Sequence, residues 1–98
     1  MPADVYALLE ARRPEILAVA EHYGVTNVRV FGSVARREAR ADTDLDLLVT
    51  FGPTATLLTH AGFQRELSDL LGIRVEVASD QGLKDRIRET VLAEAVPL

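Results

Sequence analysis

The chain has 98 residues and no cysteine, carries a formal net charge of −4, and is 48% hydrophobic. This length predicts one small domain with a single core, and the absence of cysteine excludes disulfide bonds and thiolate metal sites. The acidic balance argues against a protein that coats nucleic-acid backbones with Lys and Arg, and no apolar run approaches the ~18 residues of a membrane span, so we expect a cytoplasmic protein.

Helices and strands alternate along the predicted chain. A helix can begin at Pro14, because proline is accepted in a first helical turn, and glycine at positions 24 and 72 marks two helix ends. Apolar periodicity places the remaining elements. In chain order we predict helices over 4–12 and from Pro14, a strand over 25–31, a helix over 33–40, a strand over 45–51, a helix over 57–71, a strand over 73–77 and a helix over about 80–95. This is an α/β fold in the order α-β-α-β-α-β-α, with one domain over 1–98.

Two aspartates lie at the start of the predicted strand over 45–51. Asp44 and Asp46 are two residues apart, so their side chains project from one face of the strand, opposite its apolar residues. Two carboxylates held side by side repel each other unless a cation lies between them, and oxygen ligands of this kind suit Mg²⁺. The pair therefore predicts a metal site. The alternative is a polar turn whose aspartates accept local backbone hydrogen bonds, and we favour it for the neighbouring Asp42.

A Gly-Ser step precedes the predicted helix over 33–40. Gly32 permits a sharp turn or the close approach of a ligand, and Ser33 is a good N-cap residue. Arg36, Arg37 and Arg40 place positive charge on this short helix, which is locally unfavourable unless an anion lies at its N-terminus. A phosphate beside a hydroxyl and a guanidinium is the candidate anion, which makes Arg36 a candidate nucleotide-binding residue. The alternative is a solvated surface helix with Arg36 paired to a nearby acid.

Gly32-Ser33, ten intervening residues and Asp44-x-Asp46 together resemble the signature of the DNA polymerase β-like nucleotidyltransferase superfamily. The longer stretch VRVFGSVARREARADTDLDLLVTF resembles the minimal nucleotidyltransferases (MNT), short proteins often paired with toxins of the HEPN family. The similarity extends from about Ile16 to the C-terminal helix, and leaves no region for another module. It implies a single-domain nucleotidyltransferase fold with a small mixed sheet packed by helices. In that fold Gly32 and Ser33 hold a nucleotide triphosphate, and Asp44 and Asp46 bind Mg²⁺.

The chain departs from the family pattern at two positions. The third carboxylate of the family, normally an Asp on the next strand, maps to Glu76, which the alternation of the strand over 73–77 places on its polar face. The added methylene displaces the carboxylate, which can weaken a two-metal geometry. Arg37 stands where a glycine commonly follows the Ala-Arg of the family. Both departures bear on rate rather than fold, and a solvent-facing Arg74 and Glu76 on an ordinary strand is the alternative.

The resemblance implies Mg²⁺-dependent transfer of AMP from ATP to a hydroxyl group, with release of pyrophosphate. Asp44, Asp46 and Glu76 are the predicted catalytic residues and the ligands of two Mg²⁺ ions. The expected acceptor is a tyrosine of a partner HEPN toxin, bound in a hetero-oligomer that makes this chain an antitoxin. The alternative is a catalytically weak or inactive antitoxin that neutralises its partner by binding alone. A small-molecule transferase is less favoured because such enzymes usually need an extra domain for the acceptor, and we expect no membrane or direct nucleic-acid partner.

Overall fold

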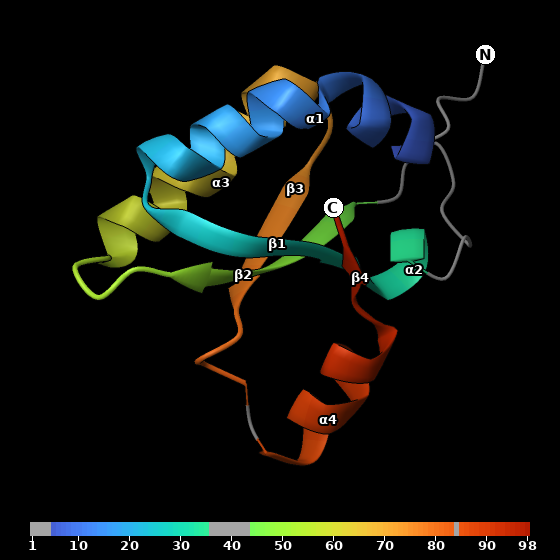
Figure 1. Ribbon diagram of the computed structural model, residues 1–98, viewed down its shortest axis with the longest axis vertical. Coiled ribbons are helices and arrows are strands. Elements are labelled where there is room, and N and C mark those ends of the chain that lie inside the picture. The colour runs from blue at the N-terminus through green and yellow to red at the C-terminus, as the bar shows by residue number, and fades with distance from the viewer. Residues whose placement is uncertain (1–4, 36–43, 84) are drawn as a thin grey trace.

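The computed structural model describes residues 5–35, 44–83 and 85–98. Its four strands are β1 (Val25–Phe31), β2 (Leu45–Phe51), β3 (Val75–Ser79) and β4 (Val96–Pro97), and its helices are α1 (Val5–His22), α2 (Gly32–Ala35), α3 (Leu57–Leu71) and α4 (Asp85–Glu94). The strands form one mixed sheet in the order β3-β2-β1-β4. The helices α1 and α3 pack together on one side of the sheet, and α4 lies on the other side (Figure 1). The predicted α/β fold with a small mixed sheet is confirmed.

The core lies between the sheet and the pair α1 and α3. In β2 the alternate residues Leu45, Leu47 and Val49 are completely buried, and they pack with Phe63 and Leu67 of α3. The helix α3 has the predicted bounds because both of its ends carry capping residues. A capping box between Thr56 and Thr59 satisfies its first turn, and Gly72 ends it in the left-handed conformation.

The helix α1 continues without interruption through Pro14. Proline lacks the N–H that would bond to the carbonyl four residues back, and usually ends or kinks a helix. The prediction of two separate helices is therefore wrong. The continuous helix is stabilised by tertiary packing, because buried residues on both sides of Pro14 join the same core. They are Val5, Leu9, Ile16 and Ala20.

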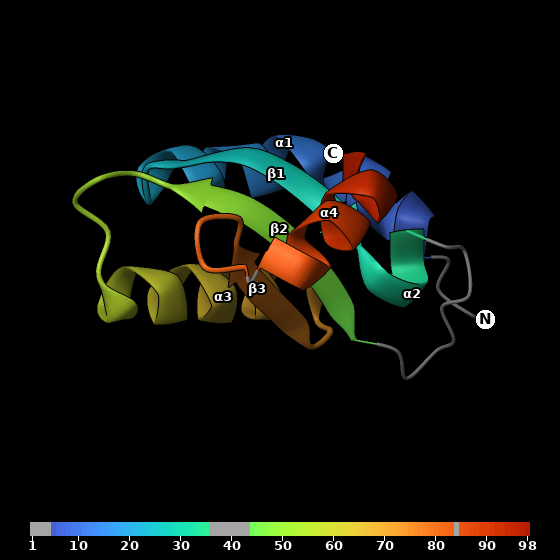
Figure 2. The ribbon, with the colours of Figure 1, turned by 90° about the horizontal axis from the view of Figure 1, so that it is seen from below.

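The register of the sheet determines which polar residues meet. The strands β1 and β2 are antiparallel and pair Phe31 with Asp46, whereas β2 and β3 are parallel and pair Asp46 with Glu76. The parallel pair is connected through α3, as parallel strands require a crossover. Seen from the side of α4, the sheet is twisted, and α2 lies beside the end of β1 (Figure 2).

The C-terminal part of the sheet differs from the predicted pattern. The strand β3 begins two residues later than predicted and extends to Ser79, and α4 begins at Asp85 rather than near residue 80. The strand β4 was not predicted, since two residues are too few to show a period, and the Leu98 N–H extends its pairing by bonding to the Val28 carbonyl at 3.0 Å. The apolar residues whose periodicity predicts this last helix do not all face the core, because Ile87 of α4 is 45% exposed.

The short helix α2 accounts for the described part of the predicted helix over 33–40, and the remainder lies outside the described residues. Within the described ranges, the model contains no helix of the length and apolar character needed to cross a membrane.

Candidate active site

The predicted carboxylates lie on the face of the sheet opposite the core. Asp44 and Asp46 are half-buried, and the strand alternation directs them away from the buried residues of β2, as predicted. Glu76 is the direct neighbour of Asp46 across the parallel pair and lies on the same face. The sheet therefore brings Asp44, Asp46 and Glu76 from two strands to one surface.

Gly32 lies directly against this surface. It has a φ of 73°, and a Cβ atom built at this position would lie 2.5 Å from Asp46 Oδ2. Real Cβ atoms essentially never come this close, so a side chain here would force the Asp46 carboxylate to shift, and the left-handed main chain would strain any residue other than glycine. The pairing of Phe31 with Asp46 produces this contact, because Gly32 follows Phe31. The structure thus joins the Gly-Ser step to the second aspartate of the predicted signature.

Arg74 reaches across two of the three carboxylates. Its Nε atom lies 3.6 Å from Asp44 Oδ2, and its Nη2 atom lies 3.4 Å from Glu76 Oε1. The carbonyl of Arg74 accepts a hydrogen bond from the Leu45 N–H at 2.9 Å, which fixes its main chain beside the start of β2. One guanidinium is therefore shared by acidic side chains of two strands. A solvent-facing Arg74 was the alternative interpretation, and its side chain is 74% exposed, but this double ion pair was not predicted.

The donor set suits a hard divalent cation in kind, because all three side chains offer carboxylate oxygens. The Arg74 guanidinium shows where positive charge is accepted, between Asp44 and Glu76. Across residues 5–35, 44–83 and 85–98, however, no three His, Cys, Asp or Glu side chains lie close enough to hold a metal ion. The residues needed for a metal site therefore share a surface, but they are not assembled into a complete ligand set.

Several predicted site residues fall outside the described part of the chain. Arg36, Arg37 and Asp42 belong to residues 36–43, so their interpretations stay predictions. The main chain of Ser33 is described within α2, directly after Gly32, but its side chain is not described.

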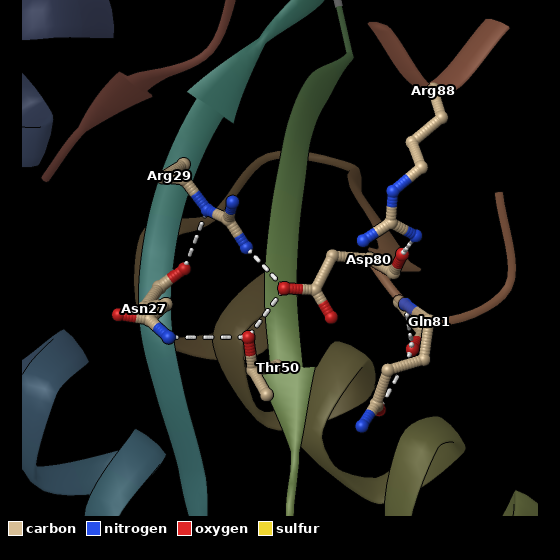
Figure 3. A network of polar contacts seen from close by, with 7 residues as sticks. Asn27, Arg29, Thr50, Asp80, Gln81 and Arg88 are labelled. Atoms are coloured by element: carbon tan, nitrogen blue, oxygen red, sulfur yellow. Dashed lines mark hydrogen bonds and ion pairs between the residues drawn. The ribbon is translucent and has the colours of Figure 1, made fainter. Parts of the chain in front are cut away.

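A polar network farther along the same face was missed by the sequence interpretation. Arg29 Nη2 lies 2.7 Å from Asp80 Oδ2, and the Thr50 hydroxyl donates to the same oxygen (Figure 3). Asn27 donates to Thr50 at 3.3 Å, and Arg88 of α4 donates to the Asp80 carbonyl at 2.7 Å. This Asp80 network links β1, β2 and the segment after β3. The weak signal in the sequence was the polar face that Arg29 and Thr50 share with Asp46.

The network determines the charge state of Asp80. Burial alone would raise the pKa of its carboxyl group, but the hydrogen bond from Thr50 and the ion pair with Arg29 outweigh burial. The pKa of Asp80 is therefore below its ordinary value. The second carboxylate oxygen, Oδ1, is buried and has no hydrogen-bond partner among the residues that the structure describes. Leu48, which is completely buried, separates this network from Asp46 along the strand.

Comparison with known proteins identifies the family of this chain. Residues 16–98 match the family model of the nucleotidyltransferase domain. The chain belongs to the nucleotidyltransferase domain family. This nucleotidyltransferase is 38% identical over 93 residues to the protein adenylyltransferase MntA of Thermococcus cleftensis, and the match covers 95% of this chain and 91% of that relative.

Solved structures share the fold of this nucleotidyltransferase. A protein assigned as a minimal nucleotidyltransferase is 54% identical, with a TM-score of 0.83 and 92% of each chain covered. A toxin–antitoxin complex crystallised with AMP-PNP has a TM-score of 0.74, with 86% of this chain and 69% of that chain covered. Its identity is 14%, so this second likeness concerns the fold alone. The resemblance to the minimal nucleotidyltransferases is thus confirmed.

Proposed function

We propose that this nucleotidyltransferase transfers AMP from ATP to a hydroxyl group of a partner protein. The adenylyltransferase named above supports AMP as the transferred group. The fold shared with a toxin–antitoxin complex supports a toxin partner and an antitoxin role for this chain. The acceptor that we propose is a tyrosine of a HEPN toxin, as the family resemblance implies. The observation that carries the proposal is the placement of Asp46 between the Gly32 turn and Glu76.

Each residue of the site has a role in this proposal. Asp44, Asp46 and Glu76 hold two Mg²⁺ ions, while Gly32, Ser33 and Arg36 receive the triphosphate. When bound, divalent cations neutralise phosphate charge and stabilise the transition state of phosphoryl transfer. The glycine at position 32 lets the main chain of the turn lie against the Asp46 carboxylate, so a phosphate held at this turn would lie close to a proposed metal ligand. The β2 strand fixes the direction of Asp46, and Asp44 lies directly before its first residue.

The proposed reaction is an in-line displacement at the α-phosphorus of ATP. The acceptor hydroxyl oxygen forms a bond to this phosphorus, the bond to the β-phosphate bridge breaks, and pyrophosphate leaves with the electron pair. The hydroxyl proton is released to solvent or to a nearby carboxylate. In this proposal the partner itself presents the acceptor hydroxyl group.

The experiment is transfer of label from ATP that carries a labelled α-phosphate. The protein is incubated with Mg²⁺ and its HEPN partner, and we expect label on the partner. Asp44→Asn removes one charged ligand from an exposed strand end, so it should abolish labelling while the thermal unfolding midpoint stays within about 2 °C. Exposed Asp69→Asn on α3 is the matched control and should label normally. Full labelling by Asp44→Asn would contradict the mechanism.

A second candidate function is neutralisation of the partner by binding alone. The observation that favours it is the incomplete ligand set, in which Asp44 and Glu76 are joined through Arg74. In the same experiment, a stable complex without label on either protein would favour this alternative. A Glu76→Asp variant that labels more strongly than the natural chain would instead indicate a working site that the longer side chain impairs.

A further inference from the structure

Arg74 occupies the position between the proposed metal ligands. Two nitrogen atoms of its guanidinium lie 3.6 Å and 3.4 Å from oxygens of Asp44 and Glu76. Because Arg74 immediately precedes β3, and its carbonyl is bonded to β2, the base of the side chain is fixed at the point where the two strands begin. The guanidinium is therefore placed by the sheet beside both carboxylates.

The charge of this group is permanent. Arginine is not deprotonated in proteins, so the guanidinium always carries one positive charge. It reduces the repulsion between the acidic side chains of β2 and β3 in the absence of a metal ion. A divalent cation that binds the same oxygens would be repelled by a guanidinium that stays in place.

We propose that Arg74 is the resident counter-ion of the carboxylate site, and that a divalent cation must displace its guanidinium from Asp44 and Glu76. This inference rests on the proposed function, which assigns both carboxylates to metal binding. In the metal-free protein, the guanidinium lies beside both carboxylates and balances part of their charge.

The ion pairs of Arg74 are weak enough for a metal ion to break them. The Arg74 side chain is 74% exposed, and its two ion pairs are near the long end of the distance range. Exposed ion pairs are weak because water screens them and the long side chains lose freedom when paired. Displacement should therefore lower metal affinity by only about five-fold to ten-fold relative to a site without the arginine.

The first experiment measures Mn²⁺ affinity of the full chain by electron paramagnetic resonance of the free ion. Arg74→Gln should bind Mn²⁺ about five-fold more tightly than the natural protein. The matched control is Arg12→Gln, which removes the same charge from an exposed ion pair with Glu15 on α1. Its Mn²⁺ affinity should be unchanged. Equal Mn²⁺ affinities for all three proteins would overturn the inference about Arg74 but would leave the metal site supported. If none of the three proteins bound Mn²⁺, the assignment of a metal site would itself be overturned.

The second experiment separates displacement from a general effect of charge. In nitrogen-15 NMR spectra, saturating Mg²⁺ should shift the Arg74 Nε–H signal toward that of a free arginine, and leave the Arg12 signal in place. Such a shift would support physical displacement. An Arg74 signal that does not change when the site is saturated would overturn the proposal even if Arg74→Gln binds metal more tightly.

Discussion

Gly32 and Gly72 share a left-handed main chain but differ in what surrounds them. Their φ angles are 73° and 68°, and any other L-residue would be strained at either position. A Cβ at Gly72 would meet nothing within 4 Å, whereas a Cβ at Gly32 would meet the Asp46 carboxylate. Substitution of either glycine by alanine would introduce the same kind of backbone strain, but only the substitution at Gly32 would also disturb the Asp46 carboxylate.

This difference leads to a prediction at the scale of single residues. Gly32→Ala and Gly72→Ala should each lower the free energy of unfolding by roughly 1–2 kcal/mol. Only Gly32→Ala should also displace Asp46, and a displacement of about 1 Å can reduce transfer by about a hundred-fold. Unfolding in urea and AMP-transfer rates measure the two effects. Equal transfer rates for the two variants would show that the Gly32 contact with Asp46 has no role in the reaction.

At the scale of elements, the Asp80 network holds three parts of the sheet together. Arg29 comes from β1, Thr50 from β2 and Asp80 from the turn after β3, and Asp80 also bonds through its N–H to the Val49 carbonyl at 2.9 Å. The side chains of Arg29 and Asp80 are only 19% and 16% exposed. Because the pair is largely shielded from water, it should contribute more than a surface ion pair.

The network predicts a dependence of stability on pH. The folded-state pKa of Asp80 is lower than its ordinary value of 3.8. Its stabilising contribution is therefore complete above that value, and is lost as the pH falls from there through the folded-state pKa. Asp80→Asn should cost about 2 kcal/mol at pH 7, and the difference from the natural protein should shrink below about pH 4. Urea unfolding at several pH values measures this difference.

The control for this prediction is Asp69→Asn, on the exposed surface of α3. It removes the same charge and should change the free energy of unfolding by less than about 0.5 kcal/mol at any pH. A cost for Asp80→Asn that is as large at pH 3 as at pH 7 would mean that the ionised carboxylate is not the stabilising form.

Element bounds were predictable where local signals act alone. Thr56 and Gly72 provide clear ends for α3, and both bounds of that helix are confirmed. Pro14 misled the prediction because its local effect is outweighed by packing on both sides of it. The strand β4 could not be predicted, since its two residues are ordered by pairing with Arg29 and Val30, which are distant in sequence.

At the scale of the whole molecule, the face of each site residue followed from the alternation of its strand. The sequence placed Asp44 and Asp46 together, and it placed Glu76 on a polar face. That Glu76 lies next to Asp46 depends on the register of β2 against β3, which is a property of the folded sheet. The contacts of Arg74 depend on the same register, and the Asp80 network depends also on the register of β1 against β2, so neither follows from the pattern of one strand alone.

We propose that the surface formed by Asp44, Asp46 and Glu76 beside Gly32 binds metal and nucleotide together. The most direct measurement is anomalous scattering from Mn²⁺ in crystals grown with a non-hydrolysable ATP analogue. We predict manganese peaks at about 2.1–2.2 Å from oxygens of Asp44 and Asp46, with the triphosphate against the Gly32 turn. Nucleotide bound elsewhere, or a surface without manganese at saturating concentration, would contradict the account.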